Sequence, residues 1–173
     1  MPLTGWKNWW SSGRGFKRGC ELKKTISILN ILLIMFYFVA CGNIDVTEKN
    51  EGSFHDKVKK IEAKQVNIQE LTEFEWDLMY TFSPYTSKEE IEEIIGFVSE
   101  DIVDNMADES TTYLLFVKDN MIVANICGST DSLGYTFDFG CYEKYLCIDN
   151  SQEATFLIME KSGIKLLEYE QKK

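Results

Sequence analysis

The sequence predicts an α+β fold in which a helix packs on one face of an antiparallel sheet of about five to six strands. Three observations support this prediction. Apolar residues alternate with polar ones over 74–82, they recur at helical spacing over 88–98, and five further strand-like segments follow residue 110. The turns between those segments are short, and short connections favour antiparallel pairing.

The first element of the domain is predicted to be a short helix that starts near Ser53. Ser53 and Asp56 have the three-residue spacing of a helix cap. Phe54, Val58 and Ile61 then recur at intervals of four and three, which places them on one helical face.

A strand with one buried face is predicted next. Its large apolar residues occupy alternate positions: Phe74, Trp76, Leu78, Tyr80 and Phe82. Pro84 ends this strand, because proline cannot donate a hydrogen bond to a neighbouring strand.

The following helix is predicted over 88–96. Ser87 and Glu90 have the spacing of a capping box, and Gly96 is suited to the end of the helix or to a close approach to the sheet. An apolar stripe at helical spacing is predicted to pack on the sheet, and it consists of Ile91, Ile94, Ile95 and Val98.

Strands are predicted to dominate the rest of the chain. Asp119 and Asn120 form a two-residue turn of the type that accepts positive φ, which predicts a hairpin. A second hairpin is predicted around residues 161–163, and a turn over 128–134. The predicted strands are 111–118, 121–127, 135–139, 154–160 and 164–169.

The first 40 residues differ chemically from the rest. Lys23 and Lys24 precede an uncharged apolar run from Ile26 to Ala40, which is typical of a secretory signal and short for a membrane span. We interpret residues 22–40 as a signal peptide and residues 1–21 as an upstream extension that is not part of the natural protein.

The residues after the apolar run, Phe38-Val39-Ala40-Cys41-Gly42-Asn43, resemble the lipobox of bacterial lipoproteins. The resemblance implies that Cys41 is diacylated on sulfur and that cleavage falls between Ala40 and Cys41. We then expect a lipidated tether over 41–52 and a globular domain over 53–173. The alternative is an uncleaved single-span anchor, and both readings place the domain on the outer face of the cell membrane.

A second resemblance lies inside the domain. Phe74-Glu75-Trp76-Asp77, Phe82-Ser83-Pro84-Tyr85-Thr86 and the helix that ends at Gly96 are similar to a signature of small uncharacterised lipoproteins of low-GC Gram-positive bacteria. This resemblance implies a lipoprotein location and an α+β fold. It implies no activity.

The charge is uneven along the chain. Residues 41–173 contain 27 Asp and Glu, 12 Lys and no Arg, which gives a net charge of −15. Such a body would be repelled by phosphate backbones, so we expect no nucleic-acid binding. It would also avoid an anionic membrane surface unless a lipid anchor held it there.

Few residues suggest catalysis. His55 is the only histidine, which argues against a histidine-based triad and a zinc site, and we expect no cofactor, no metal and no enzymatic activity. Glu75 and Asp77 lie on one face of the predicted strand and suggest the alternative of a carboxylate-dependent cell-envelope hydrolase. A calcium site is less favoured than a solvated acidic loop, and its ligands would be Asp101, Asp104, Asp108 and Glu109.

Three cysteines besides Cys41 lie in the mature chain. We favour free thiols packed as small apolar residues, and the alternative is one disulfide, Cys127–Cys141 or Cys141–Cys147. None of them has the CxxC spacing of a redox site.

Asp77 and Tyr85 are the candidate binding residues. Tyr85 follows Pro84 outside the strand, so we expect an exposed ring, whereas Trp76, Tyr80 and Phe82 are expected in the core. The predicted function is that of a non-enzymatic binding or accessory lipoprotein, and a structural spacer remains a further possibility. A neutral or cationic envelope protein or peptide would fit as its partner.

Overall fold

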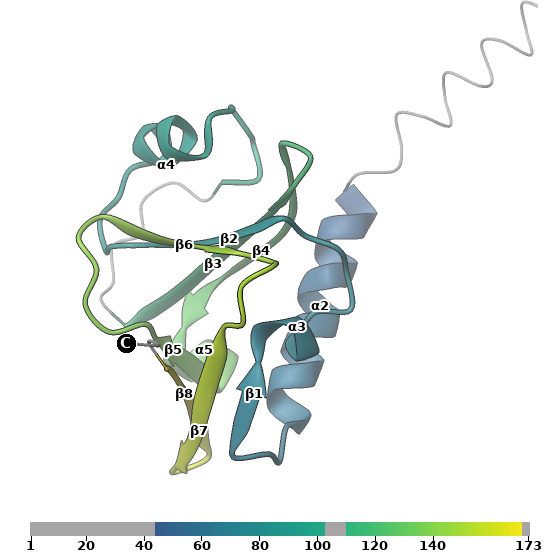
Figure 1. Ribbon diagram of the computed structural model, residues 1–173, viewed down its shortest axis with the longest axis vertical. Coiled ribbons are helices and arrows are strands. Elements are labelled where there is room, and N and C mark those ends of the chain that lie inside the picture. Colours follow the sequence, from purple (N-terminus) through teal and green to yellow (C-terminus); the bar gives the residue numbers. More distant parts are fainter. Residues whose placement is uncertain (1–43, 103–109, 171–173) are drawn as a thin grey trace, which may run out of the picture. The chain divides into compact units, whose positions relative to one another are not determined.

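The computed structural model describes residues 44–102 and 110–170 (Figure 1). The predicted signal peptide and Cys41 lie outside the described residues. The elements are α2 (Ile44–Lys60), β1 (Gln65–Asn67), α3 (Ile68–Leu71), β2 (Leu78–Phe82), α4 (Lys88–Ile95), β3 (Thr111–Lys118), β4 (Met121–Ser129), α5 (Thr130–Leu133), β5 (Tyr135–Asp138), β6 (Tyr145–Asp149), β7 (Thr155–Lys161) and β8 (Ile164–Tyr169). The predicted α+β class is confirmed. Among the described helices, none is long and apolar enough to cross a bilayer.

The strands form two four-stranded sheets, so the prediction of one sheet with five to six strands is wrong. The first has the order β4-β3-β2-β6, and all its pairs are antiparallel. The second has the order β1-β7-β8-β5, in which β5 and β8 run parallel. Parallel strands need a long connection, and here the chain passes through β6 and β7 between β5 and β8. Local sequence patterns do not reveal such a connection.

The α2 helix corrects the predicted tether. It starts at Ile44 instead of near Ser53, so residues 44–52 form its first half. Two contacts with β4 hold this half in place: the Asn50 side chain donates to the Val123 carbonyl at 2.9 Å, and the Asn125 backbone N–H donates to Glu51 Oε1 at 3.0 Å. Tertiary contacts can stabilise a helix whose sequence is mostly polar.

The main core lies between the two sheets and α2. Phe116 of β3 is fully buried at its centre. Its ring lies 5.6 Å from Phe54, 5.3 Å from Phe74 and 5.5 Å from Trp76 between centroids, within the range of favourable aromatic pairs.

A second core lies on the opposite face of the β4-β3-β2-β6 sheet, under α4. Ile91 of α4 is fully buried there against residues that include Tyr80 and Phe82. Because cores cover both faces of β2, Met79 and Thr81 are buried as well, and the prediction of a strand with one buried face is wrong. Strand pairing also begins at Leu78, four residues later than predicted.

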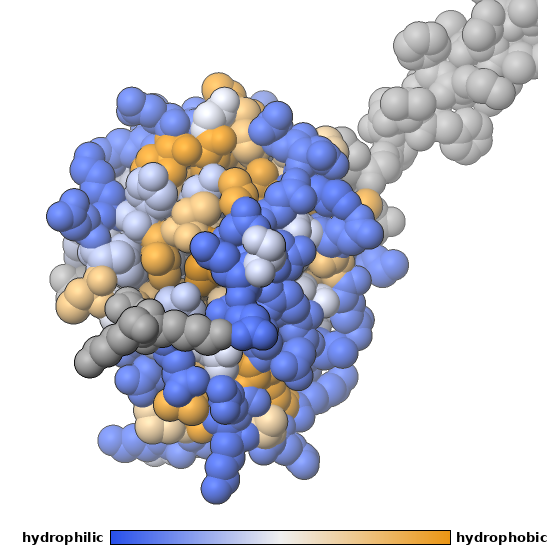
Figure 2. Space-filling view, viewed as in Figure 1, coloured by the Kyte–Doolittle hydropathy of each residue, from blue (hydrophilic) through white to orange (hydrophobic). Residues whose placement is uncertain are grey.

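The ends of α4 agree with the sequence. Ser87 Oγ accepts a hydrogen bond from the Glu90 backbone, Glu90 accepts one from the Ser87 backbone, and Gly96 ends the helix at φ 86°. Val98 departs from the predicted stripe, because its side chain is 82 % exposed. Figure 2 shows hydrophobic residues reaching the surface beside α4.

The two predicted hairpins are confirmed. Asp119 and Asn120 have φ values of 50° and 58° between β3 and β4, and Ser162 and Gly163 join β7 to β8. The predicted turn over 128–134 is the end of β4 followed by α5. The sequence analysis missed β1, α3 and β6.

Candidate binding surface

Asp77 and Glu75 hold the β3–β4 turn. Asp77 Oδ2 accepts a hydrogen bond from the Asp119 backbone at 3.0 Å, and Glu75 forms an ion pair with Lys118. This hydrogen-bonded pair lowers the pKa of the Glu75 carboxyl. Asp77 precedes β2 and Tyr85 follows it, so the structure does not bring the two predicted binding residues together.

Tyr85 occupies a strained position in a tight turn over 83–86. The Thr86 backbone N–H and hydroxyl both donate to the Ser83 carbonyl, at 3.3 and 2.7 Å. Pro84 and the positive φ of Tyr85, 70°, match a type II turn, whose third position is normally glycine or asparagine. The turn directs the chain away from β2 and leaves the Tyr85 side chain 64 % exposed, as predicted.

The turn is fastened to the segment that leads into β6. The Ser83 backbone N–H donates to the Lys144 carbonyl at 2.8 Å, and the Ser83 hydroxyl donates to the Glu143 carbonyl at 2.9 Å. Next along the chain, Tyr145 pairs with Phe82 across β6 and β2. These bonds set Tyr85 and Tyr145 on one continuous surface.

This surface is hollowed into a groove of about 540 Å³, which we call the Tyr85 groove. Its lining consists of residues 83–86, three side chains of the α4 helix (Glu90, Glu93 and Ile94) and residues 143–145. The Tyr145 side chain is 44 % exposed, so the groove presents two aromatic rings to solvent. Three carboxylates and one ammonium group line it, which gives it a negative charge.

Some polar groups of the groove are not engaged by the rest of the domain. Within residues 44–102 and 110–170, no hydrogen bond or ion pair involves the Tyr85 hydroxyl, the Glu93 carboxylate or the Glu143 carboxylate. Glu90 differs, because it caps α4 through the Ser87 backbone. The unengaged groups are therefore free to contact a ligand.

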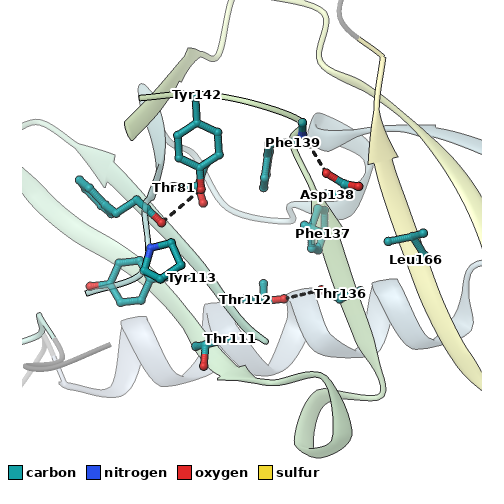
Figure 3. Close-up of a pocket in the computed structure, with 13 residues that line it drawn as sticks. Thr81, Thr111, Thr112, Tyr113, Thr136, Phe137, Asp138, Phe139, Tyr142 and Leu166 are labelled. Atoms are coloured by element: carbon teal, nitrogen blue, oxygen red, sulfur yellow. Dashed lines mark hydrogen bonds between the residues drawn. The ribbon is translucent and has the colours of Figure 1, made fainter. Parts of the chain in front are cut away.

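A second cleft of about 390 Å³ shares Pro84 with the Tyr85 groove and lies between the two sheets (Figure 3). Three of its polar side chains take part in hydrogen bonds within the domain. The Thr112 hydroxyl donates to the Thr136 hydroxyl at 3.4 Å, and the Tyr142 hydroxyl donates to the Phe82 carbonyl at 3.2 Å. Asp138 Oδ1 accepts a hydrogen bond from the Gly140 backbone N–H at 2.8 Å. The bond between Thr112 of β3 and Thr136 of β5 joins the two sheets, and we interpret the cleft as structural.

The histidine and the three cysteines that the structure describes lie in separate, partly buried or exposed environments. His55 Nδ1 lies 2.5 Å from the hydroxyl of buried Tyr135, and burial lowers the His55 pKa. Cys127, Cys141 and Cys147 are free thiols, as favoured, but Cys141 is exposed and is not packed as a small apolar residue. Burial raises the pKa of Cys127 and Cys147.

Among the residues that the structure describes, no group of three His, Cys, Asp or Glu side chains lies close enough together to hold a metal ion. Three of the four predicted calcium ligands, Asp104, Asp108 and Glu109, lie outside that part of the chain. Asp101 accepts a hydrogen bond from the Ser99 hydroxyl.

No protein-family model, curated protein or solved structure matches this chain. Sequence reasoning found Tyr85 and missed Tyr145, Glu93 and Glu143. Recognition of β6 from its strand-like residues 145–149 would have placed Tyr145 and Glu143 beside the end of β2.

Proposed function

We propose that this protein is a lipid-anchored lipoprotein on the outer face of the cell membrane. In this proposal it binds a cationic peptide segment of an envelope protein in the Tyr85 groove. The lipobox resemblance around Cys41 and the signal-like residues 22–40 support the anchor. In this proposal the protein binds and does not catalyse.

The observation that carries the binding proposal is the pairing of exposed aromatic rings with unengaged carboxylates in one groove. Tyr85 and Tyr145 offer π faces, which attract organic cations, and Glu93 and Glu143 offer charge. A net charge of −15 on residues 41–173 would further steer a cationic partner toward the domain.

The hydrolase alternative has less support. Its proposed carboxylates, Glu75 and Asp77, are both occupied in holding the β3–β4 turn. An acid and a base that act on a glycan need freedom to bind the substrate and exchange protons. These contacts favour binding over hydrolysis as the function.

A short lysine-rich peptide and the matching glutamate-rich peptide test the groove by calorimetry. The lysine-rich peptide should bind, and Tyr85→Ala or Glu93→Gln should each weaken it by about tenfold, the loss typical of an important contact. Glu160→Gln is the matched control, because Glu160 is an exposed carboxylate on β7 outside the groove. Equal weakening by Glu160→Gln would reveal nonspecific attraction and refute the groove.

Mass spectrometry of the membrane fraction tests the anchor. The wild-type protein should begin at Cys41 and carry a diacylglyceryl group, whereas Cys41→Ser should accumulate as the uncleaved precursor. Wild-type protein that retains residues 22–40 without acyl chains would contradict the anchor and favour the single-span alternative.

A further inference from the structure

We propose that a second surface, made by Val46, Val98 and Met121 and called here the apolar face, docks onto the lipid bilayer beside the anchor. This inference rests on the lipid anchor at Cys41 in the proposed function. It is independent of the ligand of the Tyr85 groove.

The apolar face gathers exposed residues from three separate elements. Val46 in the first turns of α2 is 50 % exposed, Val98 after α4 is 82 % exposed, and Met121 at the start of β4 is 55 % exposed. All three line one hollow of about 250 Å³. Its other apolar residues are Phe97, Ile122 and Val123, and its polar residues are Thr47, Ser99, Asp101 and Asn120.

The gathering of these side chains distinguishes them from isolated exposed residues. Seven large hydrophobic residues are exposed in the described part of the chain. Two of them, Tyr85 and Tyr145, line the groove, and two others, Leu157 and Met159, lie on β7. The remaining three line one hollow and form the apolar face, and exposed apolar side chains that gather in this way are candidates for an interaction site.

The chain length between Cys41 and the domain points to the bilayer as the occupant. The α2 helix starts at Ile44, three residues after Cys41. An extended link of that length followed by two helical steps keeps the Val46 Cα within about 14 Å of the Cys41 Cα. Acyl chains on Cys41 would therefore hold the apolar face next to the membrane surface.

The charge of the face selects the kind of lipid surface. Its hollow is lined by one carboxylate, Asp101, and by no lysine or arginine. Anionic headgroups would gain no favourable ion pair there, so docking would rely on insertion of apolar side chains between headgroups. We therefore expect docking on zwitterionic phosphatidylcholine bilayers.

Two methionines provide the test. Met121 lies on the apolar face and Met159 lies on β7, and their exposed fractions are similar at 55 % and 48 %. The mature lipidated protein is reconstituted into phosphatidylcholine vesicles and treated with hydrogen peroxide, and sulfoxide at each methionine is followed by mass spectrometry. Docking should slow oxidation of Met121 by about fivefold relative to Met159, because buried thioethers react slowly.

Val98→Asp supplies the matched variant. The side chain is 82 % exposed, so the substitution should leave the fold intact, and the charge should prevent insertion. In this variant Met121 and Met159 should oxidise at similar rates while the vesicles still carry the protein through flotation. Protection of Met121 that persists in Val98→Asp would overturn the proposal.

Flotation separates the possible failures. Wild-type protein that floats but shows equal methionine oxidation would disprove docking and leave the anchor intact. Protein that fails to float would disprove the anchor and the docking that depends on it. Protection that fades when the protein is diluted in excess lipid would indicate contact between copies of the chain and would also overturn membrane docking.

Discussion

Replacing Tyr85 by glycine should stabilise the domain relative to the alanine variant while it removes the proposed binding ring. Tyr85 has a φ of 70°, which costs an L-residue about 1–2 kcal/mol and costs glycine almost nothing. Glycine loses more backbone freedom on folding than alanine does, and this loss offsets about 0.5–1 kcal/mol of the strain relief. The net advantage of Tyr85→Gly over Tyr85→Ala is therefore about 0.5–1 kcal/mol.

The comparison with alanine isolates the backbone. Both variants lose the same aromatic ring, so their difference excludes the contacts of that ring. Urea unfolding measures the difference, and with a slope of about 1–3 kcal/mol per molar, Tyr85→Gly should unfold at a urea concentration roughly 0.5 M higher than Tyr85→Ala. Tyr85→Asn should fall between them, because asparagine tolerates positive φ.

A glycine variant less stable than the alanine variant by about 0.5–1 kcal/mol would show that this turn stores no strain, because only glycine's loss of backbone freedom would then separate the two. With strain present, stability and binding should change in opposite directions. Tyr85→Gly should be more stable than Tyr85→Ala, and it should bind the lysine-rich peptide more weakly than the wild-type protein does. Strained backbone that persists at an exposed residue is common at functional sites. A variant that gained stability and kept full affinity would remove the functional reading of Tyr85.

Three further predictions concern the fold. Burial lowers the pKa of His55 below its ordinary 6.5, so the unfolded chain binds a proton at His55 more tightly than the folded chain does. The melting temperature should therefore fall as the pH drops below 6.5. His55→Gln should reduce this pH dependence. Phe116→Ala should cost about 3–5 kcal/mol in urea unfolding, because it empties the centre of the main core. Ser87→Ala should cost about 1 kcal/mol in the same assay through loss of the α4 cap, and a loss below about 0.3 kcal/mol would contradict the capping role.

Local chemistry explains which elements the sequence could predict. The turn at Asp119 and Asn120 needs two residues that accept positive φ, and those residues stand between two apolar runs. Ser87 and Glu90 satisfy the first turn of α4 without help from the rest of the chain. Tyr85 was correctly expected to be exposed because Pro84 ends the strand before it.

Long-range contacts explain the errors. The first half of α2 is polar, and it contacts Val123 and Asn125, which lie more than 70 residues further along the chain. The burial of Met79 and Thr81 depends on a second layer on β2, and the Tyr85 groove depends on the pairing of β2 with β6. Local periodicity carries no information about such partners.

The corrected start of α2 changes how a lipid at Cys41 would act on the domain. A tether of a dozen flexible residues would let the domain turn freely above the bilayer, whereas a helix that starts three residues after Cys41 restricts it. The contacts of Asn50 and Glu51 with β4 fix this helix to the sheet that also carries Met121. A lipid at Cys41 would therefore stay close to the start of α2, whose Val46 belongs to the apolar face.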